Sequence, residues 1–552
     1  MKKVKTNYGY KVGKVAVDMT SYNGKDTYSD GGIEDEILAA VRQGKEKELL
    51  YNDNRWPIIY HLSDMRENLL SWLNIGKDKR VLEIGGGCGA LTGVLAEQAK
   101  TVDMVEISPR RAEIAAYRNK EYDNITIHVG NLNDMDFKEK FDYITLIGVL
   151  EYAGNFTHTA SPYSDFVEKC ASLLKTDGVL VVAIENRLGM KYFSGALEDH
   201  TGRLFDGITD YENYSGIRTF ARKELGALLL DNGFSGLEWY YPYPDYKLPT
   251  DIFSDKALPK ANEINQLENF TCDNDRIELF SEPKALASVC DAGLFGELNN
   301  SFLVLAHVNK EFTPHTVEKV HVSIMRNDSH RVATATVRIG GKKYIKKTAL
   351  TKAAKQHIKT IVENYKILAA RYGADRVAKS KLIDNGKALI MEYIEGKTFS
   401  ELMLQAVKEE GIKGLLGYLE YYYNNLVDGE GSGFCFNGFN DANRKYDTDL
   451  NFDNIIVDNN GNITCIDYEW LAPQISKELI LYNAIFLFFF SNHEFLAKYD
   501  ITFERLTEIL GINEKLVDDY ERVKYEKISN LLNCYLKNYH KKRLPLSLDL
   551  NV

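Results

Sequence analysis

The chain has 552 residues, of which 44% are hydrophobic and 27% charged, and its formal net charge is −11. This composition is typical of a globular protein, and the length predicts several domains rather than one. An acidic chain lacks the overall positive field that attracts a phosphate backbone, so we do not expect nucleic acid as the main partner. The seven cysteines show no CxxC spacing, which indicates a reducing, cytoplasmic compartment without a disulfide framework.

The first half of the chain has the pattern of an α/β domain. Residues 1–59 are interpreted as an N-terminal extension with a helical segment at 33–41. Short apolar runs then alternate with amphipathic segments, which predicts βαβ units and a parallel sheet. The runs are VLEI, VDMVEI, ITIHV, YITLIGV and VLVVAIE, with NSFLVLAHV at 300–308 as the expected last strand. Residues 186–299 are expected to form an insertion whose aromatic cluster at 239–245 covers a binding site.

A glycine-rich turn follows the first of these strands, in the run EIGGGCG at 83–89. Glycines there let the backbone turn sharply and approach a ligand closely. Glu106 ends the next apolar run, where a carboxylate can bind both hydroxyls of a ribose. The third run leads to Asn131 and Leu132, where an adenine edge would lie. Glu83 is unusual in such a motif and could face the cationic methionine part of a cofactor.

These motifs resemble the class I S-adenosylmethionine-dependent methyltransferases, over roughly residues 60–309. The resemblance implies a Rossmann-like fold with S-adenosylmethionine as cofactor. It places Gly85, Gly87 and Gly89 in the cofactor loop, Glu106 at the ribose and Asn131 at the adenine. NAD binding is the alternative, because it uses the same strand, turn and acidic residue.

Candidate residues for the methyl acceptor lie after the later strands. Methyl transfer needs alignment and a dry pocket, and it needs a general base only if the acceptor must lose a proton. His200, in a polar loop, is the candidate catalytic histidine, with a structural or solvated histidine as the alternative. Arg187 and Arg218 could hold an anionic acceptor, and surface ion pairs are the alternative for both. Other candidates at these strand ends are Glu151, Tyr152 and Asn186.

The pattern changes after a predicted linker at 310–318. Three antiparallel strands are expected at 320–325, 332–339 and 342–347, with Gly340-Gly341 as a hairpin turn, followed by a helix at 352–371. We therefore expect a sheet-rich lobe at 319–397 and a helix-rich lobe at 398–552, together an α+β bilobal domain. The apolar run 479–490 is interpreted as a core helix. An interfacial helix, with the basic tail 541–543 on anionic lipid, is the alternative.

A second polar motif lies in the helix-rich part. Asp449 and Asn454 are five residues apart, and two short apolar strands joined by Gly461-Asn462 lead to Asp467. This hairpin would bring Asn454 close to Asp467, and their oxygens suit Mg²⁺ bound to nucleotide phosphates. Asp449 would then orient a substrate hydroxyl.

This half resembles the protein-kinase-like fold, in its small-molecule branch of aminoglycoside and choline phosphotransferases. The resemblance implies ATP and Mg²⁺ as cofactors, with Asn454 and Asp467 as metal ligands and Asp449 as the catalytic residue. Lys346 would bind phosphates, or Lys347, since strand register is open. The remaining assignments are Glu363 as partner of that lysine, and Glu392 and Ile394 in the adenine hinge. RNDSHR at 326–331 stands where a glycine-rich loop would lie, so a regulatory pseudokinase is the alternative.

A methyltransferase followed by a kinase-like domain resembles the bifunctional kinase–methyltransferases that cap bacterial O-antigen polysaccharides. The resemblance implies phosphorylation of a sugar hydroxyl and methylation of the phosphate or of a hydroxyl. It also implies a glycan or small-molecule substrate and peripheral association with a membrane-bound glycan assembly at the inner face of the membrane. A natural-product methyltransferase with an independent kinase is the alternative.

Overall fold

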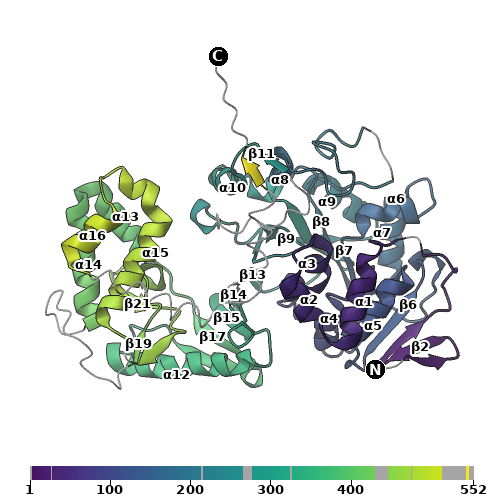
Figure 1. Ribbon diagram of the computed structural model, residues 1–552, viewed down its shortest axis with the longest axis horizontal. Helices are drawn as coiled ribbons and strands as arrows, with labels where there is room; N and C mark the ends of the chain where they lie inside the picture. The colour runs from purple at the N-terminus through teal and green to yellow at the C-terminus, as the bar shows by residue number, and fades with distance from the viewer. Residues whose placement is uncertain are drawn as a thin grey trace, which may run out of the picture. The chain divides into compact units, whose positions relative to one another are not determined.

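The computed structural model describes residues 3–26, 28–212, 216–264, 276–323, 326–428, 445–473, 475–512 and 543–545 (Figure 1). They belong to two compact units. The first comprises Met1–Ile324 with Asn530–Val552, and the second Met325–Ser529.

The first unit is built on one sheet with the strand order β1-β2-β3-β6-β5-β4-β7-β8-β12-β9-β10-β13. Strands β3, β6, β5, β4, β7 and β8 run parallel, and β12 lies antiparallel between β8 and β9. The expected Rossmann-like parallel sheet is therefore confirmed. The strands are β1 Val4–Thr6, β2 Gly9–Val12, β3 Val15–Asp18, β4 Arg80–Ile84, β5 Thr101–Glu106, β6 Ile125–Val129, β7 Phe141–Ile147, β8 Leu174–Glu185, β9 Gly236–Tyr243, β10 Asp251–Ser254, β12 Ser301–His307 and β13 Val317–Val322.

Helices cover this sheet and close its core. Residues 179–185 of β8 are all buried, as expected for a parallel strand covered on both faces. The helices are α1 Ile33–Gln43, α2 Glu46–Asn52, α3 Trp56–Leu62, α4 Thr92–Gln98, α5 Pro109–Arg118, α6 Ala153–Phe156, α7 Pro162–Leu173, α8 Met190–Phe193, α9 Arg222–Asp231, α10 Glu282–Asp291 and α11 Phe295–Leu298. Short 3₁₀ turns add η1 Asp64–Leu69, η2 Leu132–Asp134, η3 Leu150–Tyr152 and η4 Ala261–Glu263. A separate parallel pair joins β11 Arg276–Glu278 to β23 Arg543–Pro545.

Three expected boundaries differ from the structure. Residues 1–59 are not a separate extension, because β3 pairs with β6 in the sheet. The stretch 186–299 is not only an insertion, because β9 is a strand of the sheet and holds the aromatic residues 239–243. The strand expected to open the second unit is β13, which pairs with β10 of the first unit.

The second unit begins with an antiparallel sheet of order β14-β15-β17-β16. Gly340 and Gly341 have φ of 56° and 82°, the left-handed values that a two-residue hairpin turn requires. Helix α12 packs on this sheet through Ile358, Ile361 and Leu368. The elements are β14 Val332–Ile339, β15 Lys342–Ala349, α12 Ala354–Tyr372, β16 Ser380–Ile383, η5 Asp384–Gly386 and β17 Ala388–Glu392.

The rest of this unit is mainly helical, as the pattern predicts, and has a core of its own. The helices are α13 Phe399–Glu410, α14 Ile412–Tyr422, the π-helical turn η6 Tyr423–Asp428, α15 Lys477–Ala497 and α16 Phe503–Leu510. Between them lie β18 Lys397–Thr398, β19 Lys445–Asp447, η7 Phe452–Asn454, β20 Ile455–Val457, β21 Ile463–Cys465 and β22 Leu471–Pro473.

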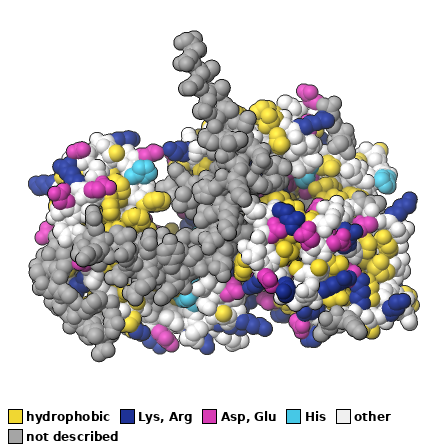
Figure 2. All heavy atoms as spheres, viewed as in Figure 1, with side chains coloured by type: hydrophobic (Ala, Val, Ile, Leu, Met, Phe, Trp, Pro, Cys, Tyr) yellow, Lys and Arg dark blue, Asp and Glu magenta, His cyan; other side chains and the backbone are white. Residues whose placement is uncertain are grey.

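Helix α15 is the one candidate membrane span in the described part of the chain. It has 21 residues and a mean hydropathy of 1.3, and half of that window is buried inside the unit. Leu481, Ile485 and Phe488 pack in the core with α13 and α14, which favours the core-helix interpretation. The basic tail 541–543 lies outside the described side chains. On the described face of the first unit in Figure 2, acidic and basic side chains lie interspersed.

Candidate active sites

A cavity of about 360 Å³ opens in the first unit at the carboxyl ends of β4, β5, β6 and β7. Ligands of open α/β sheets bind at this edge, where the strand order reverses. One part of its wall comes from the sheet: Ile84, Gly85, Gly86, Gly87, Glu106, Ile107, Asn131, Leu132, Ile147, Gly148 and Phe156. The other part includes Tyr28, Asp30, Trp56, Tyr60, His61, Arg66, Arg111, Glu151, Tyr152, Asp199, His200, Tyr246 and Lys247.

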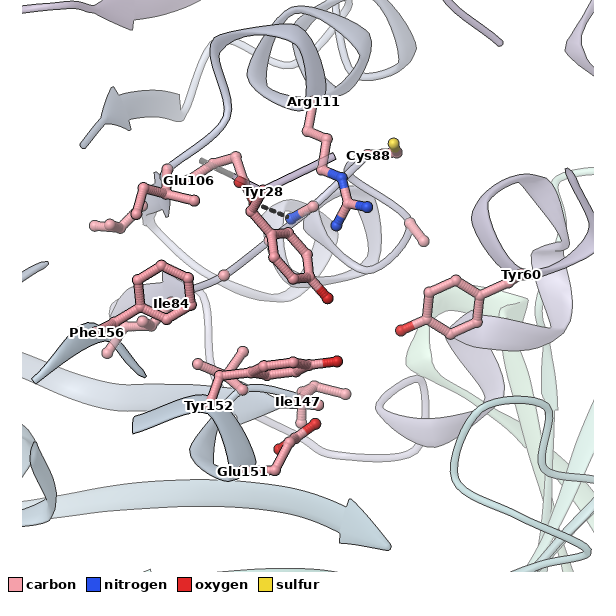
Figure 3. A pocket seen from close by; sticks show the side chains of 18 of the residues that line it. Tyr28, Tyr60, Ile84, Cys88, Glu106, Arg111, Ile147, Glu151, Tyr152 and Phe156 are labelled. Atoms are coloured by element: carbon pink, nitrogen blue, oxygen red, sulfur yellow. Dashed lines mark hydrogen bonds between the residues drawn. The ribbon is translucent and has the colours of Figure 1, made fainter. Parts of the chain in front are cut away.

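Glu106 is the polar centre of the sheet side. Its Oε2 accepts a hydrogen bond from Gly87 N at 2.7 Å, and its Oε1 accepts one from Ser108 N at 2.8 Å. Burial raises the pKa of this carboxyl above its usual range. The carboxylate thus ties the glycine loop to the end of β5 beside the cavity (Figure 3).

The glycines of the loop have different roles. Gly85 has φ +66°, and a Cβ there would lie 2.5 Å from Val149. Gly87 lines the cavity with open space around it and φ +56°. Gly89 lies outside the cavity wall and packs against Ala115 of α5. Gly85 to Gly87 therefore form the part of the loop that a ligand in the cavity would meet, and Gly89 serves helix packing.

Two other residues expected at the cofactor are engaged within the protein. Glu83 lies outside the cavity lining, where its Oε2 accepts the Thr92 hydroxyl at 2.6 Å and burial raises its pKa to about 8. It does not face a cofactor. Asn131 lines the cavity, but its amide donates to Phe156 O at 3.0 Å and its Oδ1 accepts from Asn133 N at 2.9 Å. The Asn131 side chain therefore stabilises the cavity wall instead of pointing to a ligand. The next residue, Leu132, contributes an apolar surface to the same wall.

The two arginines expected to hold an anion lie outside the cavity lining. Arg187 forms a two-pronged ion pair with Glu224, at 2.8 and 2.9 Å. Arg218 pairs with Asp210 at 3.1 Å. The ion-pair alternative therefore describes both. Asn186 donates to the backbone of Glu297 and Asn299 and is also structural.

His200 does lie in the cavity wall, beside two buried carboxylates. Its Nδ1 is 3.1 Å from the Tyr152 hydroxyl, and its Nε2 is 3.5 Å from Glu185 Oε2. Burial opposes the imidazolium, but the charges of Glu185, Glu151 and Glu198 outweigh it and raise the pKa of His200 to about 9. Burial and the charge of Glu185 raise the pKa of Glu151 to about 8. Figure 3 shows Glu151 and Tyr152 on one side of the cavity, with Tyr60 pointing in from another.

Comparisons with known proteins agree with this geometry. A family model described as a methyltransferase domain matches residues 59–238. This part of the chain is a class I S-adenosylmethionine-dependent methyltransferase domain. The match includes the glycine loop, Glu106 and the residues around Glu151 and His200.

Curated relatives of this methyltransferase domain match over short stretches. Demethylmenaquinone methyltransferase of Tropheryma whipplei (strain Twist) is 34% identical over 111 residues, which is 20% of this chain and 43% of the relative. Ubiquinone biosynthesis O-methyltransferase of Haemophilus ducreyi is 32% identical over 117 residues, 20% of this chain and 46% of the relative. The chain thus spans less than half the length of these relatives. The solved N-methyltransferase NodS from Bradyrhizobium japonicum is 15% identical, with a TM-score of 0.27 over 44% of this chain and 94% of that one.

Several residues of the methyltransferase cavity have no signal in the sequence. Tyr28, Trp56 and Tyr60 come from the stretch interpreted as an extension, and Tyr246 and Lys247 follow the end of β9. Glu185 ends β8 and lies next to the candidates Asn186 and Arg187. Like Glu106 at the end of β5, Glu185 is a carboxylate at the end of an apolar strand. That position is the one sequence signal that could have identified it.

The second unit has a buried charge cluster centred on Glu469. Lys347 contacts both Asp467 and Glu469. Glu469 also accepts hydrogen bonds from Arg326 at 2.6 Å and from His357 at 2.8 Å. Oppositely charged partners on several sides satisfy the buried carboxylate, as a stable buried charge requires.

The lysine of this cluster is Lys347 and not Lys346. Neighbouring residues of a strand face opposite sides, and Lys346 lies 3.2 Å from Asp384 instead. Glu363 is exposed and does not take part. Helix α12 reaches the cluster through His357 and through Asn364, whose amide donates to Tyr468 O and Glu469 O.

Asp449, Asn454 and Asp467 are held together by the backbone. Asn454 Nδ2 donates to Asp449 O at 2.8 Å, and Ile466 N donates to Asn454 O at 2.8 Å. Burial and the charges of Asp467 and Glu469 raise the pKa of Asp449 to about 7. The oxygens of Asn454 and Asp467 are a donor set that fits Mg²⁺. The hinge role of Glu392 and Ile394 stays a prediction: Glu392 is exposed at the end of β17, and Ile394 packs against the core around α12.

Proposed function

We propose that the first unit transfers a methyl group from S-adenosylmethionine to an acceptor hydroxyl, and that the second unit is an ATP-dependent phosphotransferase. A sugar of a surface glycan or a related small molecule is the proposed substrate of both. The observation that carries the first part is the cavity at the switch point of the sheet, with Glu106 beside the glycine loop. In this proposal Glu106 holds the ribose, and Leu132 and Phe156 flank the adenine.

A hydroxyl acceptor is favoured over a phosphate. The cavity wall beyond the glycine loop carries Glu151 and Asp199, with Glu185 directly behind. The nearby cation Lys247 is already paired with Glu185 and Asp199, and Arg187 and Arg218 are engaged outside the cavity, so neither arginine is available to hold a phosphate. Tyr60, Tyr152 and Tyr246 offer rings with polar ends, which suit a sugar.

The methyltransferase part is tested by calorimetry of S-adenosylmethionine binding. Glu106→Ala removes a carboxylate that can accept two ribose hydrogen bonds, each worth about 1.5–3 kcal/mol when the acceptor is charged. We expect the Kd to rise about 100-fold. Glu83→Gln is the matched control, because Glu83 is a nearby buried glutamate outside the cavity lining, and its Kd should change less than about threefold. An unchanged Kd in Glu106→Ala would reject the assignment.

The phosphotransferase part is tested on the two neighbouring lysines. Lys347→Met removes the cation that contacts Asp467 and should lower phosphotransfer from ATP to a glycan panel about 100-fold. Lys346→Met, on the other face of the strand, should keep the rate within about twofold. A wild-type chain that methylates its acceptor but transfers no phosphate would favour the regulatory pseudokinase.

A further inference from the structure

Three buried polar atoms that have no hydrogen bond in the described part of the chain converge beside the methyltransferase cavity, two of them, His200 Nε2 and Glu185 Oε2, 3.5 Å apart. Glu151 Oε2, Glu185 Oε2 and His200 Nε2 each lack a hydrogen-bond partner among the described residues. Each of the three residues offers a ligand atom within 4.8 Å of the others. Glu151 is 1% exposed, Glu185 0%, and the His200 side chain 7%. Most buried polar atoms in proteins are hydrogen-bonded, and the convergence of three ligand-type atoms at one point is the feature that favours a bound ion.

The neighbours of these side chains hold two of them in place. Glu185 Oε1 accepts hydrogen bonds from Lys247 at 2.6 Å and from Tyr246 at 3.2 Å, which leaves Oε2 facing the convergence point. His200 Nδ1 lies 3.1 Å from the Tyr152 hydroxyl; with the proton on Nδ1, the Nε2 lone pair could bind a metal that displaces the second proton. Outer partners that orient carboxylate and imidazole ligands in this way are the usual surroundings of a metal site.

The charges around this point are compatible with a bound divalent cation. Lys247 bridges Glu185 and Asp199, and Lys191 bridges Asp199 and Asp245. Two ammonium groups therefore face the three carboxylates of Glu185, Asp199 and Asp245. Without a metal, protons on His200 and Glu151 keep this cluster close to neutral. A divalent cation bound by a neutral His200 and an ionised Glu151 would take the place of those two protons, so the site could exchange them for the ion without a change in its charge.

We propose that Glu151, Glu185 and His200 bind a divalent metal ion of the Mg²⁺ or Mn²⁺ class that coordinates the acceptor hydroxyl. Two carboxylates suit these hard ions, and the imidazole favours Mn²⁺ of the two. Glu151 and His200 line the cavity, so a metal ion held by them would be within reach of an acceptor bound there. The proposal rests on the proposed function and adds to it the class of acceptor: an alcohol or a vicinal diol, of which sugars offer many.

The metal changes the chemistry of the acceptor oxygen. A metal-bound hydroxyl has a lowered pKa and releases its proton to water in the cavity mouth. The oxygen then attacks the methyl carbon of the sulfonium. A C–O bond forms, the C–S bond breaks, and its electron pair stays on sulfur, which leaves a neutral thioether. In this reaction His200 is a ligand rather than the general base.

The test is a titration of the chelator-treated full chain with MnCl₂, in the absence of nucleotide, followed by electron paramagnetic resonance of free Mn²⁺. Glu185→Gln and His200→Gln should each remove one Mn²⁺ site or weaken it at least about tenfold. Glu238→Gln is the matched control, because Glu238 is a buried carboxylate that bonds His307 at 3.0 Å and His315 at 2.9 Å in the same unit. It should leave that site unchanged.

Calorimetry of S-adenosylmethionine binding on the same samples separates the two proposals. Unchanged uptake by both site variants shows that they are folded. Two outcomes overturn the metal proposal alone, provided that S-adenosylmethionine still binds. In the first, the wild type binds no Mn²⁺. In the second, the wild type, Glu185→Gln and His200→Gln bind Mn²⁺ equally well. Loss of the site in Glu238→Gln but not in Glu185→Gln also overturns it. Failure of the wild type to take up S-adenosylmethionine overturns the proposed function instead.

Discussion

At the scale of single residues, the carboxyl group of Asp449 is held in an unfavourable environment. It is half-buried near Asp467 and Glu469, and its pKa of about 7 contrasts with an ordinary value of about 3.9 in an unfolded chain. A raised pKa means that the folded state binds this proton more tightly. The group therefore favours folding below about pH 4, and this contribution is lost as the pH rises to about 7.

We predict that Asp449→Asn stabilises the second unit at pH 8 and changes little at pH 4. The amide lacks the charge that Asp467 and Glu469 repel, and after allowance for screening we expect a gain of about 1–2 kcal/mol. Urea unfolding at the two pH values measures it, and phosphotransfer should be lost in the same variant.

Asp458→Asn is the control for this pH dependence. Asp458 is exposed, and hydrogen bonds from Asn462 lower its pKa. Removing this carboxylate should therefore lower the free energy of unfolding at high pH, whereas Asp449→Asn raises it. Equal pH profiles for the two variants would contradict the argument from burial.

At the scale of elements, the glycine loop joins β4 to α4 and also lets α5 approach closely. A Cβ on Gly89 would lie 2.8 Å from both Cα and Cβ of Ala115 in α5. Gly87 has a similar positive φ, but a Cβ on Gly87 would have no heavy atom within 4 Å. The two positions therefore separate backbone strain from packing.

We predict that Gly89→Ala destabilises the first unit by about 3 kcal/mol, of which about 1–2 kcal/mol comes from the left-handed backbone and the rest from the clash with α5. Gly87→Ala should cost only the backbone part, yet it should weaken S-adenosylmethionine binding more, because Gly87 lines the cavity. Urea unfolding and calorimetry of both variants measure the two effects. A larger loss of stability in Gly87→Ala would reject this division of roles.

At the scale of the whole molecule, the chain comprises two compact units, each with a candidate nucleotide site of its own. The cavity with Glu106 belongs to the first unit, and the cluster of Lys347, Asp449 and Asp467 belongs to the second. A ligand that binds only the folded state of one unit stabilises that unit by mass action.

We predict that each cofactor raises the unfolding temperature of a different unit. At a concentration of about 100 times its Kd, a ligand adds about 2.7 kcal/mol to the free energy of unfolding of the unit that binds it. For domains of this size, each kcal/mol raises the unfolding temperature by about 2–4 °C, so we expect a rise of several degrees. Differential scanning calorimetry should show S-adenosylmethionine raising one transition and ATP with Mg²⁺ raising the other. Glu106→Ala should abolish the first shift and leave the second. If both ligands raise the same transition, the two-site arrangement is wrong.

Local features of the fold could be predicted from the sequence. The apolar runs that became β4 to β8 carry their periodicity in neighbouring residues, and Gly340-Gly341 specifies a hairpin turn by its backbone freedom alone. Glu106 follows its strand directly, so its place beside the glycine loop was also predictable. Each of these signals depends on residues a few positions apart.

Register and side-chain partners were not predictable in the same way. A shift of one residue in β15 decides whether Lys346 or Lys347 reaches the charge cluster. In α12, Asn364 faces the cluster and the neighbouring Glu363 does not, and the sequence does not show which of the two does. Arg187 looked available for an anion until the fold brought Glu224 to it.

The sequence by itself determined the parallel sheet, the glycine loop with Glu106 beside it, and the grouping of Asp449, Asn454 and Asp467, because strand periodicity and short hairpins encode them locally. Only the tertiary structure decided that residues 1–59 complete the sheet and wall the cavity, and that Glu151, Glu185 and His200 meet at one point. Those three residues come from separate loops and strand ends, and the distance between them is set by how β7, β8 and the loop after α8 pack, which no local pattern records.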